Sequence, residues 1–129
     1  MSSATNEGHL APVLLLDDDE NMLEALGDVV RSLGHRECIT VPSYAALIKL
    51  GDRALACGVA ILDINLGQGV PSGIDAYRWL RESRFRGRIV FLTGHARGHP
   101  LVEQAHCLGR ALVVQKPTEM DSLLELIEG

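Results

Sequence analysis

The feature that most constrains the fold is a regular alternation between short apolar runs and segments with helical spacing. The apolar runs are rich in Val, Ile and Leu and cover 12–16, 37–41, 58–63, 88–93 and 111–115. Continuous apolar runs of this kind are typical of strands in a parallel sheet buried on both faces. Between them, apolar residues recur every three or four positions, as in amphipathic helices. The alternation predicts an α/β domain, a (βα)5 three-layer sandwich with a central five-stranded parallel sheet.

Local signals support the same division of the chain. Ser43 precedes "YAALIKL" and fits a helix N-cap. The last segment, 118–129, opens with a capping-box-like pair, Thr118 and Asp121. Glycines lie at further expected helix boundaries. Gly34, Gly51 and Gly109 follow expected helices, and Gly73 precedes one.

Length and composition indicate one globular domain. The 129 residues are 47% apolar and 22% charged, which suits a single sizeable core. We expect 1–11, which are small and polar, to form a flexible leader, and 12–129 to form the domain. The leader lacks a secretory pattern, and no apolar stretch approaches the roughly 18 residues that span a bilayer, so we expect a cytoplasmic protein with no membrane contact. The initial Met favours a natural N-terminus, whereas the ending leaves the C-terminus undecided.

Charge and cysteine content argue against nucleic-acid binding and against a metal or redox site built from cysteines. The formal net charge is −5, from 12 basic and 17 acidic residues. Nucleic-acid binding needs clustered basic side chains that neutralise phosphates. We expect no direct binding of this kind, and we interpret the arginines of "RESRFRGR" at 81–88 as a solvated helix end. Cys38, Cys57 and Cys107 lack metal or redox spacing and are expected to be reduced thiols in the core.

Polar side chains occur where the apolar runs end. The first run ends in Asp17 and Asp18, the third in Asp63, the fourth in Thr93 and the fifth in Lys116. In open parallel sheets, ligands bind outside the carboxyl ends of the strands, near the point where the strand order reverses. We therefore expect these side chains to share one pocket.

The residue types in this pocket suit phosphoryl transfer. Mg²⁺ binds through one or two carboxylates together with phosphate oxygens, and a carboxylate can attack phosphorus to form an aspartyl phosphate. A hydroxyl and an ammonium group would bind the phosphoryl oxygens. Because carboxylates this close repel one another, a metal ion would also offset the cost of bringing them together.

Four motifs, "VLLLDDDE", "VAILDINL", "FLTGHA" and "VVQKPT", closely resemble in order and spacing the receiver domain of two-component response regulators. The resemblance covers 12–129 and implies a flavodoxin-like fold and a bacterial signalling protein that is not an enzyme in the usual sense. Such a domain accepts a phosphoryl group from a histidine kinase or phosphotransfer protein and then switches its contacts with a target protein or output domain. Slow, Mg²⁺-dependent self-hydrolysis follows. We expect a monomer or weak dimer.

The resemblance also implies a role for each residue at the strand ends. The phosphoacceptor falls on Asp63, and Thr93 and Lys116 fall on the residues that sense the phosphoryl group. Asp18 would bind the metal directly and Asp17 mainly through water. The full metal set implied is Asp17, Asp18, Asp63 and the backbone carbonyl of Asn65.

Two departures from the family pattern affect signalling. In the loop "INLGQGVPSG", Gly67 stands where proline is common and Gly73 lies two positions later than usual, which indicates a glycine-rich insertion. The insertion either reshapes kinase access and hydrolysis or has no consequence. Three residues before the lysine, where Tyr or Phe is frequent in the family, this chain has Val113. The family's switch mechanism that relies on rotation of this aromatic side chain therefore does not apply to this chain. Gly94 replaces a common Ala, and Pro117 follows the lysine as in the family.

Nearby polar residues have simpler interpretations. Asp19 and Glu20 are expected at the N-cap and first turn of the first helix, where acids favour the helix dipole. His95 and His99 are spaced like metal ligands on a helix. Pro100 and the preceding glycine disfavour a helix through both, so we expect ordinary exposed histidines.

Two other functions stay open at this point. A phosphatase of the haloacid-dehalogenase type, using an aspartyl phosphate, would carry a second acid two residues after its nucleophile, where this chain has Asn65. A flavodoxin-like cofactor binder would carry a phosphate loop rich in Ser, Thr and Gly after the first strand. The acids at 17–20 would repel a phosphate there without a metal.

Overall fold

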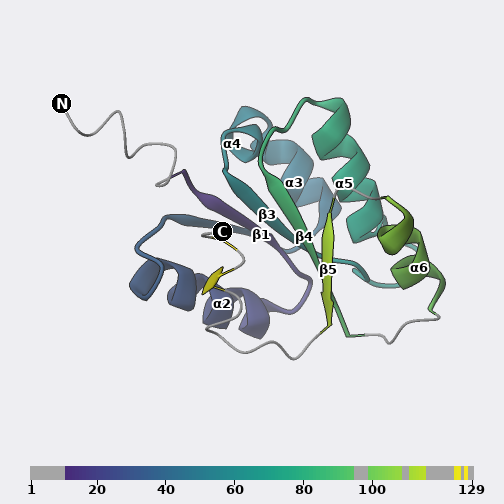
Figure 1. The fold of residues 1–129 in the computed structure, drawn as a ribbon, viewed down its shortest axis with the longest axis horizontal. Coiled ribbons are helices and arrows are strands. Elements are labelled where there is room, and N and C mark those ends of the chain that lie inside the picture. Colours follow the sequence, from purple (N-terminus) through teal and green to yellow (C-terminus); the bar gives the residue numbers. More distant parts are fainter. Residues whose placement is uncertain (1–10, 95–98, 109–110, 116–123, 126, 128–129) are drawn as a thin grey trace.

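Five parallel strands form the centre of the computed structural model, which describes residues 11–94, 99–108, 111–115, 124, 125 and 127. The strands are β1 Val13–Leu16, β2 Cys38–Val41, β3 Val59–Asp63, β4 Arg88–Thr93 and β5 Leu112–Gln115. They pair in the order β2-β1-β3-β4-β5, every neighbour parallel (Figure 1). The predicted five-stranded parallel sheet is therefore confirmed, each strand beginning within one residue of its apolar run.

Helices connect the strands as the (βα) pattern requires. In the described residues they are α2 Glu20–Ser32, α3 Tyr44–Leu50, α4 Asp52–Leu55, α5 Gly73–Glu82 and α6 Pro100–Cys107. Ser43 is the N-cap of α3, as predicted, since its Oγ accepts a hydrogen bond from the Ala46 amide at 3.1 Å. The short α4 was not predicted, because Gly51 was interpreted only as a helix end. Thr118 and Asp121 lie outside the described residues.

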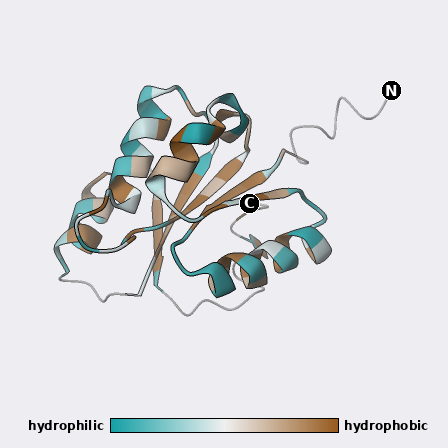
Figure 2. Ribbon diagram, turned by 180° about the vertical axis from the view of Figure 1, so that it is seen from behind, coloured by the Kyte–Doolittle hydropathy of each residue, from teal (hydrophilic) through white to brown (hydrophobic). Residues whose placement is uncertain are grey.

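The strands alternate their side chains between two hydrophobic cores. Val13 and Leu15 pack with α2 and with Ile127, whereas Leu14 and Leu16 pack with α3, α4, α5 and α6. This is the period-two geometry of a β-strand applied to a sheet with helices on both faces. Figure 2 shows the strands hydrophobic over most of their length and the helices mixed. The predicted three-layer sandwich is confirmed.

Strand β5 departs from the prediction of burial on both faces. It lies at one edge of the sheet, and Leu112 at its start is 48% exposed. Strands β1 and β3, which lie inside the sheet, are buried throughout. An apolar run in the sequence does not distinguish an edge strand from a central one, because both pack against helices.

The order of the strands places a switch point between β1 and β3. The chain moves outward from β1 to β2 and then returns to the other side of β1 for β3, β4 and β5. At such a point the helices that follow the two neighbouring strands leave toward opposite faces, which opens a crevice at the carboxyl ends. Asp17, directly after β1, and Asp63, at the end of β3, both lie at this switch point.

A buried arginine joins the two ends of the described chain. Arg36 follows α2, and its guanidinium donates to the carbonyl of Ala11 and, at 2.7 Å, to the carbonyl of Ile127. The segment before β1 and the segment that holds Ile127 are thereby held against one another. Among the described residues, no helix is both long enough and apolar enough to cross a bilayer.

The cysteines differ from the prediction in one respect. Cys38 and Cys57 are buried, as expected, but Cys107 is exposed on α6. Burial raises the pKa of Cys38 to about 11, against a smaller opposing effect of Arg31, and burial likewise raises the pKa of Cys57 to about 11. Both buried thiols therefore stay protonated at neutral pH. Because the thiolate is the reactive form, they should be inert in the folded chain.

Thiol labelling tests this assignment. We expect one thiol of the folded chain to react rapidly with Ellman's reagent near neutral pH, and all three to react after unfolding in guanidinium chloride. Cys107→Ser should abolish the rapid phase. Rapid labelling of two or more thiols in the folded chain would contradict the burial of Cys38 and Cys57.

Candidate functional site

Three carboxylates meet at the carboxyl ends of β1 and β3. Asp17 and Asp18 directly follow β1, and Asp63 is the last residue of β3. One carboxylate oxygen from each of the three lies within 4.8 Å of the others, with Asp17 and Asp63 buried and Asp18 exposed. The two motifs are far apart in sequence, and the pairing of β1 with β3 brings them together.

The backbone after β1 fixes the orientation of the acids. The Asp17 carboxylate accepts a hydrogen bond from the Asp19 amide at 2.9 Å, so its side chain is held against the turn. Asp19 in turn is the N-cap of α2, accepting from the amides of Asn21 and Met22. Glu20 is the first residue of this helix. The prediction that Asp19 and Glu20 start the first helix is confirmed.

Thr93 lies at the carboxyl end of β4, the strand that pairs with β3. It is the last residue of β4, is 2% exposed, and follows Leu92, the residue paired with Asp63. The amide of Ile64 donates to the Leu92 carbonyl at 3.0 Å, which continues the pairing of these strands past Asp63. Gly94 comes next, and a Cβ placed there would meet no atom of the described residues within 4 Å. The threonine therefore sits at the same sheet edge as Asp63.

The remaining predicted residues near the site fall into two groups. Lys116, Pro117 and His95 lie outside the described residues, so their positions stay predictions. Val113 lies on β5, paired with Phe91 of β4 and half-buried against the core shared with α3–α6.

The loop after Asp63 is built from turns that need glycine. Asn65 accepts a hydrogen bond from the Gly67 amide through its side-chain oxygen at 3.0 Å. Gly67 and Gly69 have φ angles of +123° and +73°, which L side chains rarely adopt. Val70 is 52% exposed at the tip. The two-residue insertion inferred from the sequence thus forms part of a surface loop beside the carboxylates.

Gly73 allows α5 to begin directly against the end of β3. Its amide donates to the Ile64 carbonyl at 2.8 Å, and a Cβ at this position would lie 2.1 Å from the carbonyl oxygen of Asp63. No side chain fits there without displacing the backbone of Asp63. The sequence identified this glycine by its place in the motif, but the reason for it is this backbone contact.

Two helix caps near the site were missed by sequence reasoning. Ser72 caps α5 by accepting from the Ile74 amide, and Asp75 accepts from the Ser72 amide at 2.8 Å, a capping box that the spacing S-x-x-D could have indicated. His99 caps α6, its Nδ1 accepting from the Leu101 amide at 3.2 Å. His99 therefore has a helix-capping role, and with Pro100 at the first position its sequence signal was available.

The three carboxylates form a donor set that fits a hard divalent cation. All the ligand atoms are oxygens, and the exposed side at Asp18 leaves room for water and phosphate oxygens. Mg²⁺ prefers this composition, with one or two protein carboxylates and the remaining positions filled by water or substrate. If a metal binds, Asp17, Asp18 and Asp63 are the described side chains that would hold it.

Comparison with known proteins identifies the family. A family model described as the response regulator receiver domain matches residues 13–128. The response regulator protein TmoT of Ectopseudomonas mendocina is 35% identical over 115 residues, covering 89% of this chain and 50% of that protein. TodT of Pseudomonas putida is 35% identical over 117 residues, covering 89% of this chain and 48% of that protein. The chain belongs to the response regulator receiver domain family, and it spans about half the length of these curated relatives.

Solved structures show the same fold. A receiver domain protein from Clostridium thermocellum superposes with a TM-score of 0.78 at 23% identity, covering 92% of this chain and 91% of that one. A CheY-like receiver domain protein from Methanospirillum hungatei gives 0.79 at 21% identity, with the same coverage. At these identities the likeness concerns the fold, and it confirms the flavodoxin-like arrangement.

Replacing Gly73 tests how tightly the site is built. Gly73→Ala should lower the free energy of unfolding by about 1–3 kcal/mol or more, because the added methyl collides with backbone rather than with a movable side chain. The measurement is urea denaturation followed by circular dichroism.

Gly94→Ala is the matched control, since its Cβ would meet no atom within 4 Å among the residues that the structure describes, and its stability should change by less than about 0.5 kcal/mol. Equal stability of Gly73→Ala and the unaltered chain would show that the close approach to Asp63 is wrong.

Proposed function

We propose that this chain accepts a phosphoryl group on Asp63 from a phosphohistidine, and that the resulting aspartyl phosphate switches its contacts with other proteins. The observation that carries the proposal is the convergence of the Asp17, Asp18 and Asp63 carboxylates within 4.8 Å at the switch point of the sheet. Membership of the receiver family supports the same reaction.

The proposed reaction is a displacement at phosphorus. An oxygen of the Asp63 carboxylate forms the new P–O bond, the P–N bond to the imidazole breaks, and the imidazole leaves with its electron pair and takes up a proton. Asp63 suits the nucleophile because the pairing of β3 with β1 and β4 fixes its backbone. Thr93 would donate a hydrogen bond to a phosphoryl oxygen, and Lys116 would supply a positive charge.

Asp17 and Asp18 have the complementary task of holding Mg²⁺. When bound, this ion neutralises charge on the phosphoryl oxygens during transfer. Asp17 is buried and fixed by the Asp19 amide, and Asp18 is exposed, so the pair presents one rigid and one adjustable carboxylate. The backbone carbonyl of Asn65 would complete the protein ligands.

The proposed partners follow from the same role. A histidine kinase or phosphotransfer protein would supply the phosphoryl group, and a target protein or an attached output domain would receive the signal. We further propose that the chain works in the cytoplasm and turns over phosphate only by its own slow hydrolysis, so that it is not an enzyme acting on separate substrates. Asn65 in place of a second acid disfavours the phosphatase alternative.

Phosphorylation by a small donor tests the acceptor. Incubation with acetyl phosphate and Mg²⁺ should add one phosphoryl group to the intact mass, and Asp63→Asn should abolish the adduct because an amide is a poor nucleophile. Asp28→Asn is the matched control, since Asp28 is an exposed aspartate on α2, and it should be phosphorylated normally. An adduct that persists in Asp63→Asn would refute the proposal. Many turnovers of p-nitrophenyl phosphate would instead favour a phosphatase.

Metal binding can be tested without any phosphoryl donor. Mg²⁺ at ten times its dissociation constant should stabilise the chain by roughly 1.4 kcal/mol, seen as a rise in melting temperature that EDTA reverses. Asp18→Asn should lose most of this rise. Without Mg²⁺ the variant should be at least as stable as the unaltered chain, because one of three repelling charges is gone. A melting temperature that is insensitive to both Mg²⁺ and EDTA would contradict the metal site.

A further inference from the structure

A group of arginines lies at the amino ends of the strands, opposite to the candidate site at their carboxyl ends. Five of the chain's 12 basic residues fall between positions 78 and 88, namely Arg78, Arg81, Arg84, Arg86 and Arg88. Helix α5 ends and β4 begins within this stretch, so the turn 83–87 lies at the amino ends of the strands, whereas Asp63 lies at their carboxyl ends. Strand β4 separates the two edges by roughly 17 Å, at about 3.3 Å per residue.

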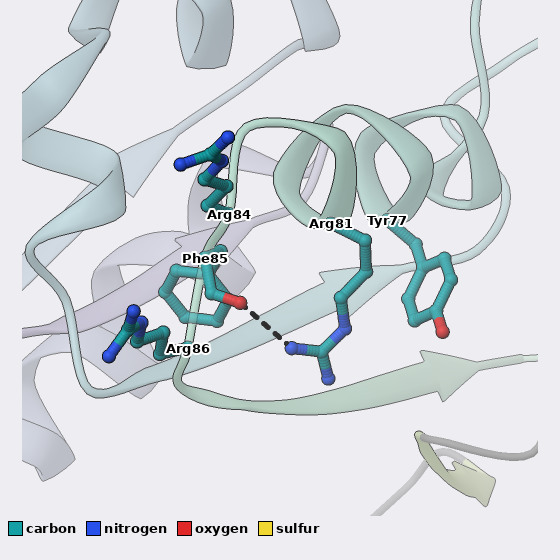
Figure 3. Close-up of a pocket in the computed structure, with 5 residues that line it drawn as sticks. All are labelled: Tyr77, Arg81, Arg84, Phe85 and Arg86. Carbon is teal, nitrogen blue, oxygen red and sulfur yellow. Dashed lines mark hydrogen bonds between the residues drawn. The ribbon is translucent and has the colours of Figure 1, made fainter.

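Three of these arginines line a pocket together with two aromatic residues. Tyr77, Arg81, Arg84, Phe85 and Arg86 line a cavity of about 620 Å³ (Figure 3). Tyr77 and Phe85 are buried, and the Arg81 guanidinium carbon lies 5.6 Å from the centre of the Tyr77 ring. A pocket that combines aromatic surface with guanidinium groups suits a ligand that carries negative charge.

The turn beside the pocket is held by hydrogen bonds within the chain. The Arg81 guanidinium donates to the carbonyls of Phe85 at 3.0 Å and Gly87 at 3.2 Å. Gly87 also packs closely against another loop, since a Cβ there would lie 2.5 Å from the carbonyl oxygen of Gly58. Arg81 thus serves the structure of the turn, whereas Arg84, Arg86 and Arg88 are exposed, as the prediction of a solvated helix end requires.

Arg84 occupies a position where a side chain is costly. Its φ is +69°, and it lies directly after the last residues of α5 in a Schellman-type ending, with the Phe85 amide bonded to the Leu80 carbonyl at 2.8 Å and the Arg84 amide to the Arg81 carbonyl at 3.1 Å. Glycine is the residue that normally occupies this left-handed position. A strained non-glycine residue is a reason to look for a function of its side chain.

Arg84 and Arg86 project outward from the turn. Figure 3 shows their side chains leaving on either side of Phe85, pointing away from Arg81 and from one another. Both residues are exposed, and within the part of the chain that the structure describes their guanidinium groups make no hydrogen bond or ion pair. Between positions 76 and 88, Glu82 is the only acid.

We propose that this arginine pocket binds an acidic segment of a partner protein, with Arg84 and Arg86 each holding a carboxylate. Guanidinium groups pair with carboxylates through two parallel hydrogen bonds. Because the two side chains diverge, one small anion cannot reach both, whereas an extended segment with several acids can. A nucleic acid fits less well, because its dense phosphates would meet the net charge of −5 beyond this corner. The pocket is separate from the Asp63 edge, so both could be occupied together.

The proposal is tested with a fluorescein-labelled octaglutamate peptide, followed by anisotropy. Arg84→Gln with Arg86→Gln should weaken binding by about tenfold or more, which is the loss of roughly 1.4 kcal/mol. Lys49→Gln with Arg53→Gln removes the same charge on α3 and α4 and should leave binding within about twofold. Equal weakening by both pairs would reduce the effect to overall charge and overturn the proposal. Tighter binding of a single-stranded oligonucleotide than of the peptide would overturn it as well, as would no peptide binding by the unaltered chain.

The variant Arg84→Gly separates the effect on peptide binding from the effect on stability. Arg84→Gly should raise the melting temperature, because the left-handed backbone is then unstrained, and should still weaken peptide binding. Phosphorylation by acetyl phosphate should be unchanged in all these variants, which keeps the test distinct from that of Asp63. Peptide binding by Arg84→Gly that equals that of the unaltered chain would show that the Arg84 side chain takes no part.

Discussion

Electrostatic repulsion among three carboxylates is the constraint on which the rest of the site depends. Asp17, Asp18 and Asp63 approach within 4.8 Å of one another, an arrangement that costs free energy unless a cation or hydrogen bonds offset it. The fold maintains it with rigid neighbours. The pairing of β1 with β3 fixes the backbones, the Asp19 amide holds Asp17, and Gly73 lets α5 begin against the Asp63 carbonyl. A cluster that is unfavourable alone becomes a ready site for a divalent cation.

Two groups of charged side chains lie at opposite ends of the strands. Acids gather at the carboxyl ends of the strands, and arginines gather at the amino ends around the turn between α5 and β4. Helix α5 connects these edges, beginning at Gly73 beside Asp63 and ending at the strained Arg84 turn. A single rigid element thus borders both the proposed phosphoryl site and the proposed docking pocket. The arrangement lets a partner bind at one edge without covering the chemistry at the other.

Much of the fold could be predicted because local sequence and tertiary structure agree. The apolar runs became strands with starts shifted by at most one residue, and Ser43 and Asp19 cap helices as their residue types suggest. The failures have physical reasons. The short α4 follows a glycine that also ends α3. His99 caps α6 by accepting an amide hydrogen bond through a ring nitrogen, which is an unusual acceptor at a helix start. Exposed Leu112 and Cys107 are apolar or neutral residues whose burial depends on neighbours distant in the chain.

The sequence by itself determined the class of fold, the family and the identity of the carboxylates, because these rest on periodicity and on residue types at strand ends. Tertiary structure alone decided which contacts those residues make. Gly73 is required because its backbone lies close to that of Asp63. Arg81 donates hydrogen bonds to two carbonyls, and Arg84 has a left-handed backbone conformation. These properties depend on distances between segments that are remote in sequence and on backbone angles. Neither these distances nor these backbone angles can be read from residue type and spacing. The arginines at 81–88 therefore looked like a solvated helix end in the sequence, and only the tertiary structure shows that three of them line a pocket.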